Sequence, residues 1–187
     1  MTKKIIAFGA SSSKNSINKI FSNYTAHQIP DASVTLLDLN DFEMPIYSID
    51  KERETGIPEL AKSFKKEIKN SDGIVISFAE HNGSYTAAFK NIFDWVSRLE
   101  GSVWDNKPML LLATSPGGRG GKTVLETAAK SYSFMNKNEI SSFSLPSFKA
   151  NFDSEKGIID SELNTNFKTI LKQFDDALQN AELTAIS

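Results

Sequence analysis

The stretch IIAFGASSSKNSINKIF, residues 5–21, predicts the fold of this chain. It opens on an apolar run at residues 5–8, which is too short for a helix and is typical of a strand buried on both faces. A polar loop follows, and apolar residues then recur at helical spacing, which predicts a helix at about 16–28. A buried strand, a polar loop and a helix in this order are typical of a parallel α/β sheet.

The same alternation recurs along the rest of the chain. The expected strands cover 5–8, 34–39, 74–78, 109–113 and 140–145. The expected helices cover about 16–28, 58–70, 85–100, 122–135 and 160–181, and residues 40–57 are expected to form a loop. The order βαβαβαβαβα predicts a parallel sheet with helices on both faces. We expect one domain over residues 1–187, with a frayed tail at about 182–187.

Composition narrows the functional classes. The chain has 187 residues, of which 40% are hydrophobic and 24% charged, as in ordinary soluble globular proteins. Zero cysteines exclude a disulfide scaffold and a cysteine-ligated metal. The net charge is -2 and the sequence has no basic stripe, which argues against a general nucleic-acid binder. No apolar run is long enough to span a bilayer or to act as a signal peptide. We therefore expect a cytoplasmic protein with neither a nucleic-acid nor a membrane partner.

The first candidate site is the hydroxyl-rich loop from Ser11 to Asn18, which opens the first helix. Ligands of open parallel sheets bind at the carboxyl ends of the strands, where this loop is expected. A helix N-terminus offers free N–H groups to an anion, and serine hydroxyls add donors. The loop therefore predicts a phosphate site without a charged clamp. The alternative is that its serines only cap the helix.

A second polar loop, residues 80–84, follows the third expected strand. Polar side chains at that point are placed to contact the edge of a planar ring, and Gly83 permits close backbone approach. The alternative is a tight turn followed by a Ser84 helix cap.

The third loop carries Gly117, Gly118, Gly120 and Gly121 around Arg119. A plain turn needs one or two glycines, and each glycine adds a cost in backbone entropy. We therefore favour close contact with a flat ligand over a simple turn.

Several familiar motifs are absent. Gly121-Lys122-Thr123 resembles the end of a nucleotide-hydrolase phosphate loop, but that pattern requires glycine where Pro116 stands. The dinucleotide fingerprint G-x-G-x-x-G fails after the first strand, and no G-x-S-x-G elbow is present. Two separated histidines and no cysteine give no metal site. We assign neither a metal ligand nor a catalytic residue.

Together the three loops resemble the NADPH-dependent FMN reductase family over about residues 4–145. The family's first loop reads approximately G-S-x-R-x-x-S-x-N, and residues 10–18 read ASSSKNSIN. Its second block reads P-E-Y-N-G-S-x-P-x-x-L-K-N-x-I-D-W, and residues 79–95 read AEHNGSYTAAFKNIFDW. Its third is S-P-G-G-x-G-G, matched by residues 115–121. The second block is long and specific.

The resemblance implies a flavodoxin-like three-layer sandwich, with strand order 2-1-3-4-5, that binds FMN. The phosphate would be held by Ser11, Ser13, Ser16, Ile17 and Asn18. The isoalloxazine edge would lie along Glu80, His81, Asn82 and Gly83, and Ser115, Gly117, Gly118 and Arg119 would flank the ring or its ribityl chain. The chain departs from the family pattern at Ala10, Ser13, Ala79 and His81, which stand in place of glycine, arginine, proline and tyrosine.

The implied activity is hydride transfer from NAD(P)H to FMN N5, with NAD(P)+ leaving before an acceptor takes the electrons in the same place. Quinones, azo dyes, free flavin and metal-ion oxidants are candidate acceptors. The family generally forms dimers or tetramers, and an aromatic patch around Phe89, Phe93 and Trp95 is a candidate interface. The alternatives are a flavodoxin-type electron carrier, usually more acidic than this chain, and an FMN-less regulatory protein of the same fold.

Overall fold

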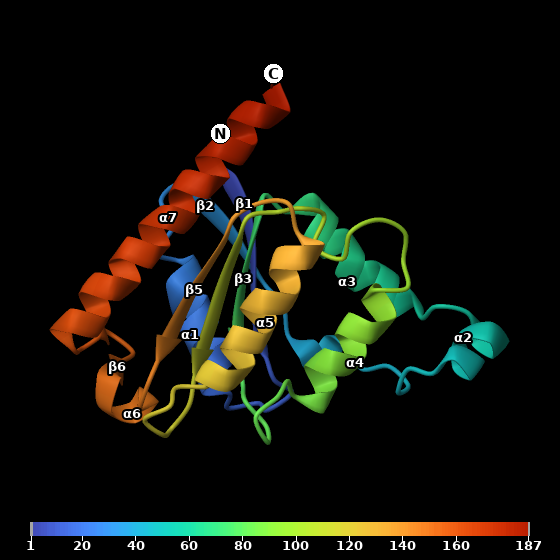
Figure 1. Ribbon diagram of the computed structural model, residues 1–187, viewed down its shortest axis with the longest axis horizontal. Helices are drawn as coiled ribbons and strands as arrows, with labels where there is room; N and C mark the ends of the chain where they lie inside the picture. Colours follow the sequence, from blue (N-terminus) through green and yellow to red (C-terminus); the bar gives the residue numbers. More distant parts are fainter. Residues whose placement is uncertain (1, 187) are drawn as a thin grey trace.

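The computed structural model describes residues 2–186 and contains a five-stranded parallel sheet in the order β2-β1-β3-β4-β5 (Figure 1). Its strands are β1 (Lys3–Ala10), β2 (Ala32–Leu36), β3 (Gly73–Phe78), β4 (Met109–Thr114) and β5 (Ile140–Leu145). The three central strands are buried along nearly their whole length, as their continuous apolar sequences require. The predicted fold class and strand order are confirmed.

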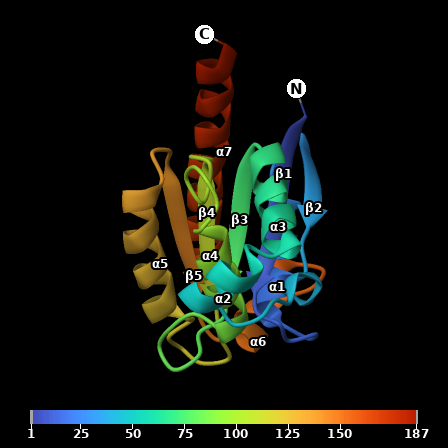
Figure 2. The ribbon, with the colours of Figure 1, turned by 90° about the vertical axis from the view of Figure 1, so that its right-hand side faces the viewer.

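Helices cover both faces of the sheet (Figures 1 and 2). They are α1 (Ile17–Ala26), α3 (Glu59–Asn70), α4 (Ala87–Val96), α5 (Lys122–Met135) and α7 (Ser161–Ile186). Alternate strand residues point to opposite faces, so Phe8 packs with α3 and α4 while its neighbour Ala7 packs with α1 and α7. The result is a three-layer arrangement with an apolar core on each side of the sheet.

Short elements occupy stretches that the sequence pattern did not resolve. The expected loop at 40–57 contains the 3-10 helix η1 (Leu39–Phe42) and the helix α2 (Ile49–Thr55). After β5 come α6 (Phe148–Asn151) and a small antiparallel pair, β6 (Phe152–Asp153) with β7 (Gly157–Ile158). Each is only two to seven residues long, which is too short for apolar periodicity to be visible.

The last helix is longer than expected. The sequence placed its end at about 181, followed by a frayed tail, but α7 continues to Ile186. Residues 181–186 contain neither glycine nor proline and include two alanines, so nothing in this segment interrupts a helix. Ser187, the end of the expected tail, lies outside the described residues.

The aromatic patch proposed as an interface belongs to the core. Phe89 and Trp95 are completely buried, and Phe93 is half-buried against Trp104 and Tyr132. The Trp95 indole N–H also donates a 2.7 Å hydrogen bond to the Pro45 carbonyl. Phe89 and Trp95 therefore stabilise the α4 layer and offer no surface to a partner, and Phe93 is exposed only in part. None of the helices among residues 2–186 is both long and apolar enough to cross a membrane.

Candidate functional site

The three predicted loops meet at one edge of the sheet, because they follow the adjacent parallel strands β1, β3 and β4 (Figure 1, lower edge). Strand order reverses next to β1, which pairs with β2 on one side and with β3 on the other. A reversal of this kind is the usual ligand site of an open α/β sheet. The fold therefore brings the predicted loops together at the expected place.

One buried side chain joins the ends of these strands. The Asn18 amide, in the first turn of α1, donates to the Thr114 carbonyl at 3.1 Å. Its oxygen accepts from the Thr114 N–H at 3.0 Å and from the Ser77 hydroxyl at 2.8 Å. Asn18 is only 3% exposed. Its side chain thus holds the loops in register and is not free to contact a ligand.

The first loop presents backbone donors. Ser16 caps α1, and its hydroxyl accepts from the Lys19 N–H. The N–H groups of Ile17 and Asn18 precede the first intrahelical hydrogen bond, and no partner for them occurs within residues 2–186. Together with the exposed hydroxyls of Ser12 and Ser13, they form an anion-binding surface at the positive end of the helix dipole.

The second loop is a tight turn. His81 and Ser84 exchange two backbone hydrogen bonds of 3.0 Å each. Between them, Asn82 and Gly83 have φ values of 52° and 75°, the left-handed conformation that an Asn-Gly pair adopts readily. The turn therefore has a fixed backbone, with the exposed side chains of His81 and Asn82 at the site edge.

The Glu80 carboxylate has a structural partner. It accepts a 3.0 Å hydrogen bond from the Val124 N–H, in the first turn of α5. The residue at the cap position of α5 is Gly121, which has no side chain to supply this contact. Glu80 therefore caps a helix from a different strand and ties the second loop to the third.

The cap of α4 is Thr86, two residues after the Ser84 that the alternative reading favoured. The Thr86 hydroxyl accepts from the Phe89 N–H at 3.2 Å and donates to the Ala10 carbonyl at the end of β1 at 2.9 Å. Sequence reasoning missed Thr86, Ser77 and Thr114 as residues that shape the site. The Thr-x-x-Phe spacing before the apolar helix face was the one available signal for Thr86.

The glycines of the third loop fall into two pairs. Gly120 and Gly121 have φ values of 61° and 71° and pack closely, so that a Cβ at Gly120 would lie 2.5 Å from the Ser144 Oγ. Gly117 and Gly118 lie outside the positive-φ region, and a Cβ on either would meet nothing within 4 Å. The fold therefore requires glycine at positions 120 and 121 but not at positions 117 and 118. The second pair leaves an open surface for another molecule.

The polar side chains of this loop make only local contacts. The Ser115 hydroxyl donates to the Gly117 carbonyl at 3.1 Å, and Arg119 donates to the Thr123 hydroxyl at 2.9 Å. Arg119 is exposed, and none of the ion pairs among the described residues involves it. Its charge is therefore available to a ligand at the site edge.

These residues fit FMN. The first loop supplies N–H and hydroxyl donors for a phosphate, and the second supplies a fixed polar turn. The Gly117–Gly118 pair forms an open cradle, whose backbone a flat ligand can approach and which larger side chains would obstruct. Beneath the site, burial raises the pKa of Tyr85 above its ordinary value and that of Tyr132 well above it. Both phenols therefore stay neutral at physiological pH.

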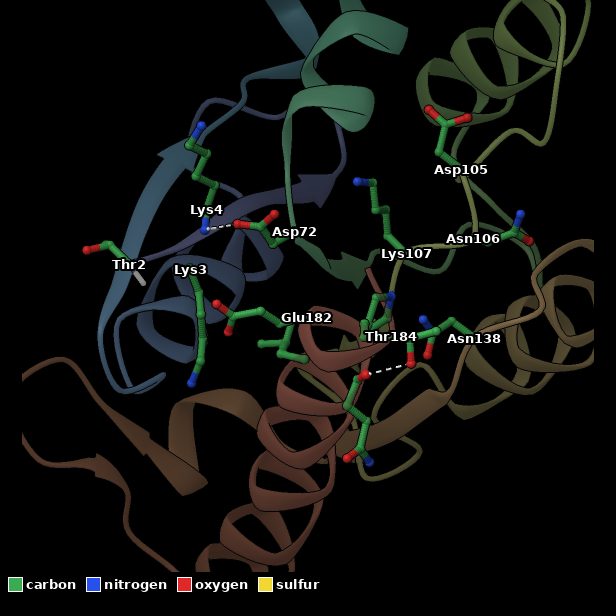
Figure 3. Close-up of a pocket in the computed structure, with 14 residues that line it drawn as sticks. Thr2, Lys3, Lys4, Asp72, Asp105, Asn106, Lys107, Asn138, Glu182 and Thr184 are labelled. Atoms are coloured by element: carbon green, nitrogen blue, oxygen red, sulfur yellow. Dashed lines mark hydrogen bonds between the residues drawn. The ribbon is translucent and has the colours of Figure 1, made fainter. Parts of the chain in front are cut away.

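Among the described residues, one cavity lies near this site and another lies far from it. One of about 360 Å³ lies beside the first loop and is lined by Ser12, Met44, Ile46 and Asn91, among others. The other, of about 680 Å³, lies at the opposite edge of the sheet (Figure 3). Its lining includes Lys3, which pairs with Asp175, and Asp105, which pairs with Lys65. Because the lining carries as many carboxylates as lysines, this second cavity is a poor phosphate site.

The chain belongs to the NADPH-dependent FMN reductase family, whose model matches residues 3–150. The predicted resemblance is thereby confirmed. The 2-hydroxy-1,4-benzoquinone reductase of Burkholderia sp is 36% identical over 122 residues, covering 64% of each chain. The quinone reductase of Escherichia coli K12 is 30% identical over 54% of this chain and 56% of its own. The matched segments thus span less than two thirds of these relatives.

Solved structures share the fold at low sequence identity. FerB, a flavoenzyme NAD(P)H:(acceptor) oxidoreductase from Paracoccus denitrificans, superposes with a TM-score of 0.75 at 22% identity, covering 96% of this chain and 98% of its own. An FMN-dependent NADH-azoreductase from Bacillus anthracis, solved with FMN, gives a TM-score of 0.59 at 14% identity, covering 95% and 97%. These likenesses support the flavodoxin-like fold.

Proposed function

We propose that the protein is an FMN-dependent NAD(P)H oxidoreductase that reduces a small acceptor, with quinones the favoured class. The observation that carries this proposal is the open Gly117–Gly118 pair, which the fold does not need, at the same sheet edge as the free N–H groups of α1. Family membership and relatives named as quinone reductases support it.

In this proposal the first loop holds the FMN phosphate through Ser11, Ser13, Ser16 and the backbone N–H groups of Ile17 and Asn18. The predicted role of Asn18 is thus confined to its backbone, since its amide is engaged elsewhere. The isoalloxazine edge lies along His81, Asn82 and Gly83, whose position Glu80 maintains through α5. Ser115, Gly117, Gly118 and Arg119 flank the ring or its ribityl chain.

When bound, FMN supplies the hydride chemistry between the nicotinamide and the acceptor. The protein's part is to bind and orient: glycines let a flat ligand approach the backbone, and oriented N–H groups stabilise negative charge. Arg119 and Lys14 are exposed cations at the site edge that could favour the additional phosphate of NADPH over NADH.

The first test is the visible spectrum of the purified protein with added FMN, followed by NADPH and then NADH without air. We expect bound yellow flavin that bleaches within seconds and recovers on addition of a benzoquinone. Bound flavin that neither nucleotide bleaches would instead indicate an electron carrier. Failure to bind FMN would indicate a regulatory protein of the same fold.

We further propose a homodimer whose contact includes α2. This helix stands apart from the sheet in Figure 1, has no buried residue, and is only seven residues long. A helix that short is unstable in water without packing. Glu52 fixes it to Arg98, which lies just after α4, yet Ile46 and Ile49 are 77% and 43% exposed. Because Ile46 also lines the cavity beside the first loop, a second copy there would close the site.

The absence of cysteine is in keeping with a cytoplasmic location.

A further inference from the structure

We propose that His81 is a catalytic residue, the general acid that gives a proton to the acceptor oxygen as a quinone-type acceptor is reduced. This inference rests on the proposed function and goes beyond it, because hydride transfer by itself needs no acid from the protein. The proposal is based on the His81 side chain, which is exposed and has no hydrogen-bond partner among the described residues. Its backbone is fixed by the turn at the edge of the proposed FMN site.

The two histidines of the chain differ in their surroundings. The His27 ring, at the end of α1, lies 2.9 Å from the Asn23 carbonyl through Nδ1. The His81 ring has neither a hydrogen-bond nor an ion-pair partner among residues 2–186. Yet the His81 backbone is held from both sides by Ser84. A fixed backbone with an unengaged ring is the arrangement of a side chain positioned for an external ligand.

The other ionisable groups around the turn are less suited to this role. The Glu80 carboxylate accepts from the Val124 N–H of α5, and Arg119 of the third loop is permanently charged. Lys14 of the first loop and Lys122 of α5 are exposed ammonium groups. Burial keeps Tyr85, just before α4, a neutral phenol. Imidazole is the one group here that ordinarily gains and loses a proton near neutral pH.

The chemistry requires one proton besides the hydride. A quinone becomes a hydroquinone by gaining two electrons and two protons: the hydride brings both electrons and one proton. As one carbonyl oxygen gains negative charge, the imidazolium N–H bond breaks and a new O–H bond forms on that oxygen. The neutral ring then takes a proton from water, to which His81 is exposed. A proton placed in this way is typically worth about 10²–10⁴-fold in rate.

The test separates acceptors that need a proton from those that do not. FMN-loaded protein is reduced by light without nucleotide and mixed rapidly with a benzoquinone or with ferricyanide, which takes single electrons and no proton. We compare the wild type, His81→Gln, His81→Ala with and without added imidazole, Tyr85→Phe, and His27→Gln as the matched control.

We expect the ratio of quinone rate to ferricyanide rate to fall at least about tenfold in His81→Gln and to recover in His81→Ala with imidazole. His27→Gln should keep the wild-type ratio. An unchanged ratio in His81→Gln, or a loss confined to Tyr85→Phe, would overturn the proposal.

A second measurement does not depend on flavin. In NMR spectra of the FMN-free protein, a benzoquinone or its hydroquinone should shift the ring signals of His81 and leave those of His27 in place. If the proposed function is wrong, the protein will fail to bind FMN in the spectral test described above. The NMR titration needs no FMN, so it tests the contact between His81 and the acceptor independently of that result. An unmoved His81 signal would refute the inference.

Discussion

Asn18 shows how one residue can set the shape of the whole site. Its amide makes three hydrogen bonds to Thr114 and Ser77 from a nearly fully buried position. We expect Asn18→Ala to lower the free energy of unfolding by about 2 kcal/mol or more, because buried groups left without partners cost about 1–3 kcal/mol each. Chemical denaturation of the FMN-free protein measures this loss. Asn15→Ala, in the exposed part of the same loop, should change stability by less than about 0.5 kcal/mol.

The two glycine pairs make a second prediction at this scale. Gly118→Ala should leave the stability of the FMN-free protein the same or slightly higher, since its methyl meets nothing and alanine reduces unfolded-state entropy. It should nonetheless weaken FMN binding, measured by flavin fluorescence titration. Gly120→Ala should lower stability by more than about 1 kcal/mol, because its φ is 61° and its Cβ would lie 2.9 Å from the Pro146 nitrogen. Wild-type FMN affinity in Gly118→Ala would remove the main support for the cradle.

These residues also show where sequence reasoning stopped. The pattern predicted the three loops and their common edge, but it explained the glycine-rich loop as a whole by contact with a flat ligand and gave no separate reason for Gly120 and Gly121. Gly120 is explained by Ser144 and Pro146, which lie more than twenty residues further along the chain. Likewise, the partners of Asn18 are 59 and 96 residues away. Contacts at such separations are fixed by tertiary packing and leave no local pattern to read.

At the scale of elements, an ion pair connects α1 to the segment after β2. Lys19 donates to the Asp38 carboxylate, which also accepts from the Asn40 N–H, and these contacts lower the pKa of Asp38 below its ordinary value. Because its folded-state pKa is lowered, the Asp38 carboxylate stabilises the folded protein at pH values above its unfolded-state pKa of about 3.9. This stabilisation is lost as pH falls through the folded-state pKa.

We therefore expect Asp38→Asn to lower the melting temperature at pH 7, with an effect below about 1 kcal/mol for so exposed a pair. The difference from wild type should begin to shrink as pH falls below about 4, where the unfolded-state carboxylate becomes protonated, and should vanish only at lower pH, once the native carboxylate is protonated as well. Melting curves between pH 2.5 and 7 test this. Asp41→Asn, an exposed neighbour without an ion pair among the described residues, serves as the control. Equal losses at both ends of the pH range would contradict the assignment.

Most elements could be predicted, and the missed ones share a physical cause. The five strands and five long helices carry apolar runs or apolar periodicity, and these patterns identified them to within a few residues. Helix α2 has no apolar stripe facing the core, and it is fixed by the Ser48 cap and the Glu52–Arg98 ion pair. Helix α4 begins after Thr86 because Ser84 is already used in the turn.

For the whole molecule, the proposed dimer predicts a specific sensitivity. Replacing Ile46 and Ile49 together by glutamate should shift the protein toward monomer in analytical ultracentrifugation, because the charges would be buried in the contact. Leu183→Glu, on α7 and with an exposed fraction between those of Ile46 and Ile49, should leave the association state unchanged. A dimer that survives the double substitution would place the contact elsewhere. FMN affinity should fall with the dimer if the second copy closes the site.

Helix α7 lies beyond the residues that match the family, yet it covers much of one face of the sheet. Phe167, Phe174 and Leu178 are almost fully buried there, and the Leu178 side chain leaves no room for a Cβ at Gly73. A chain shortened after residue 150, at the edge of the family match, would leave a continuous apolar surface bare. We expect such a fragment to accumulate as insoluble aggregate on expression, so the boundary of the family match is a poor guide to where this protein can be shortened.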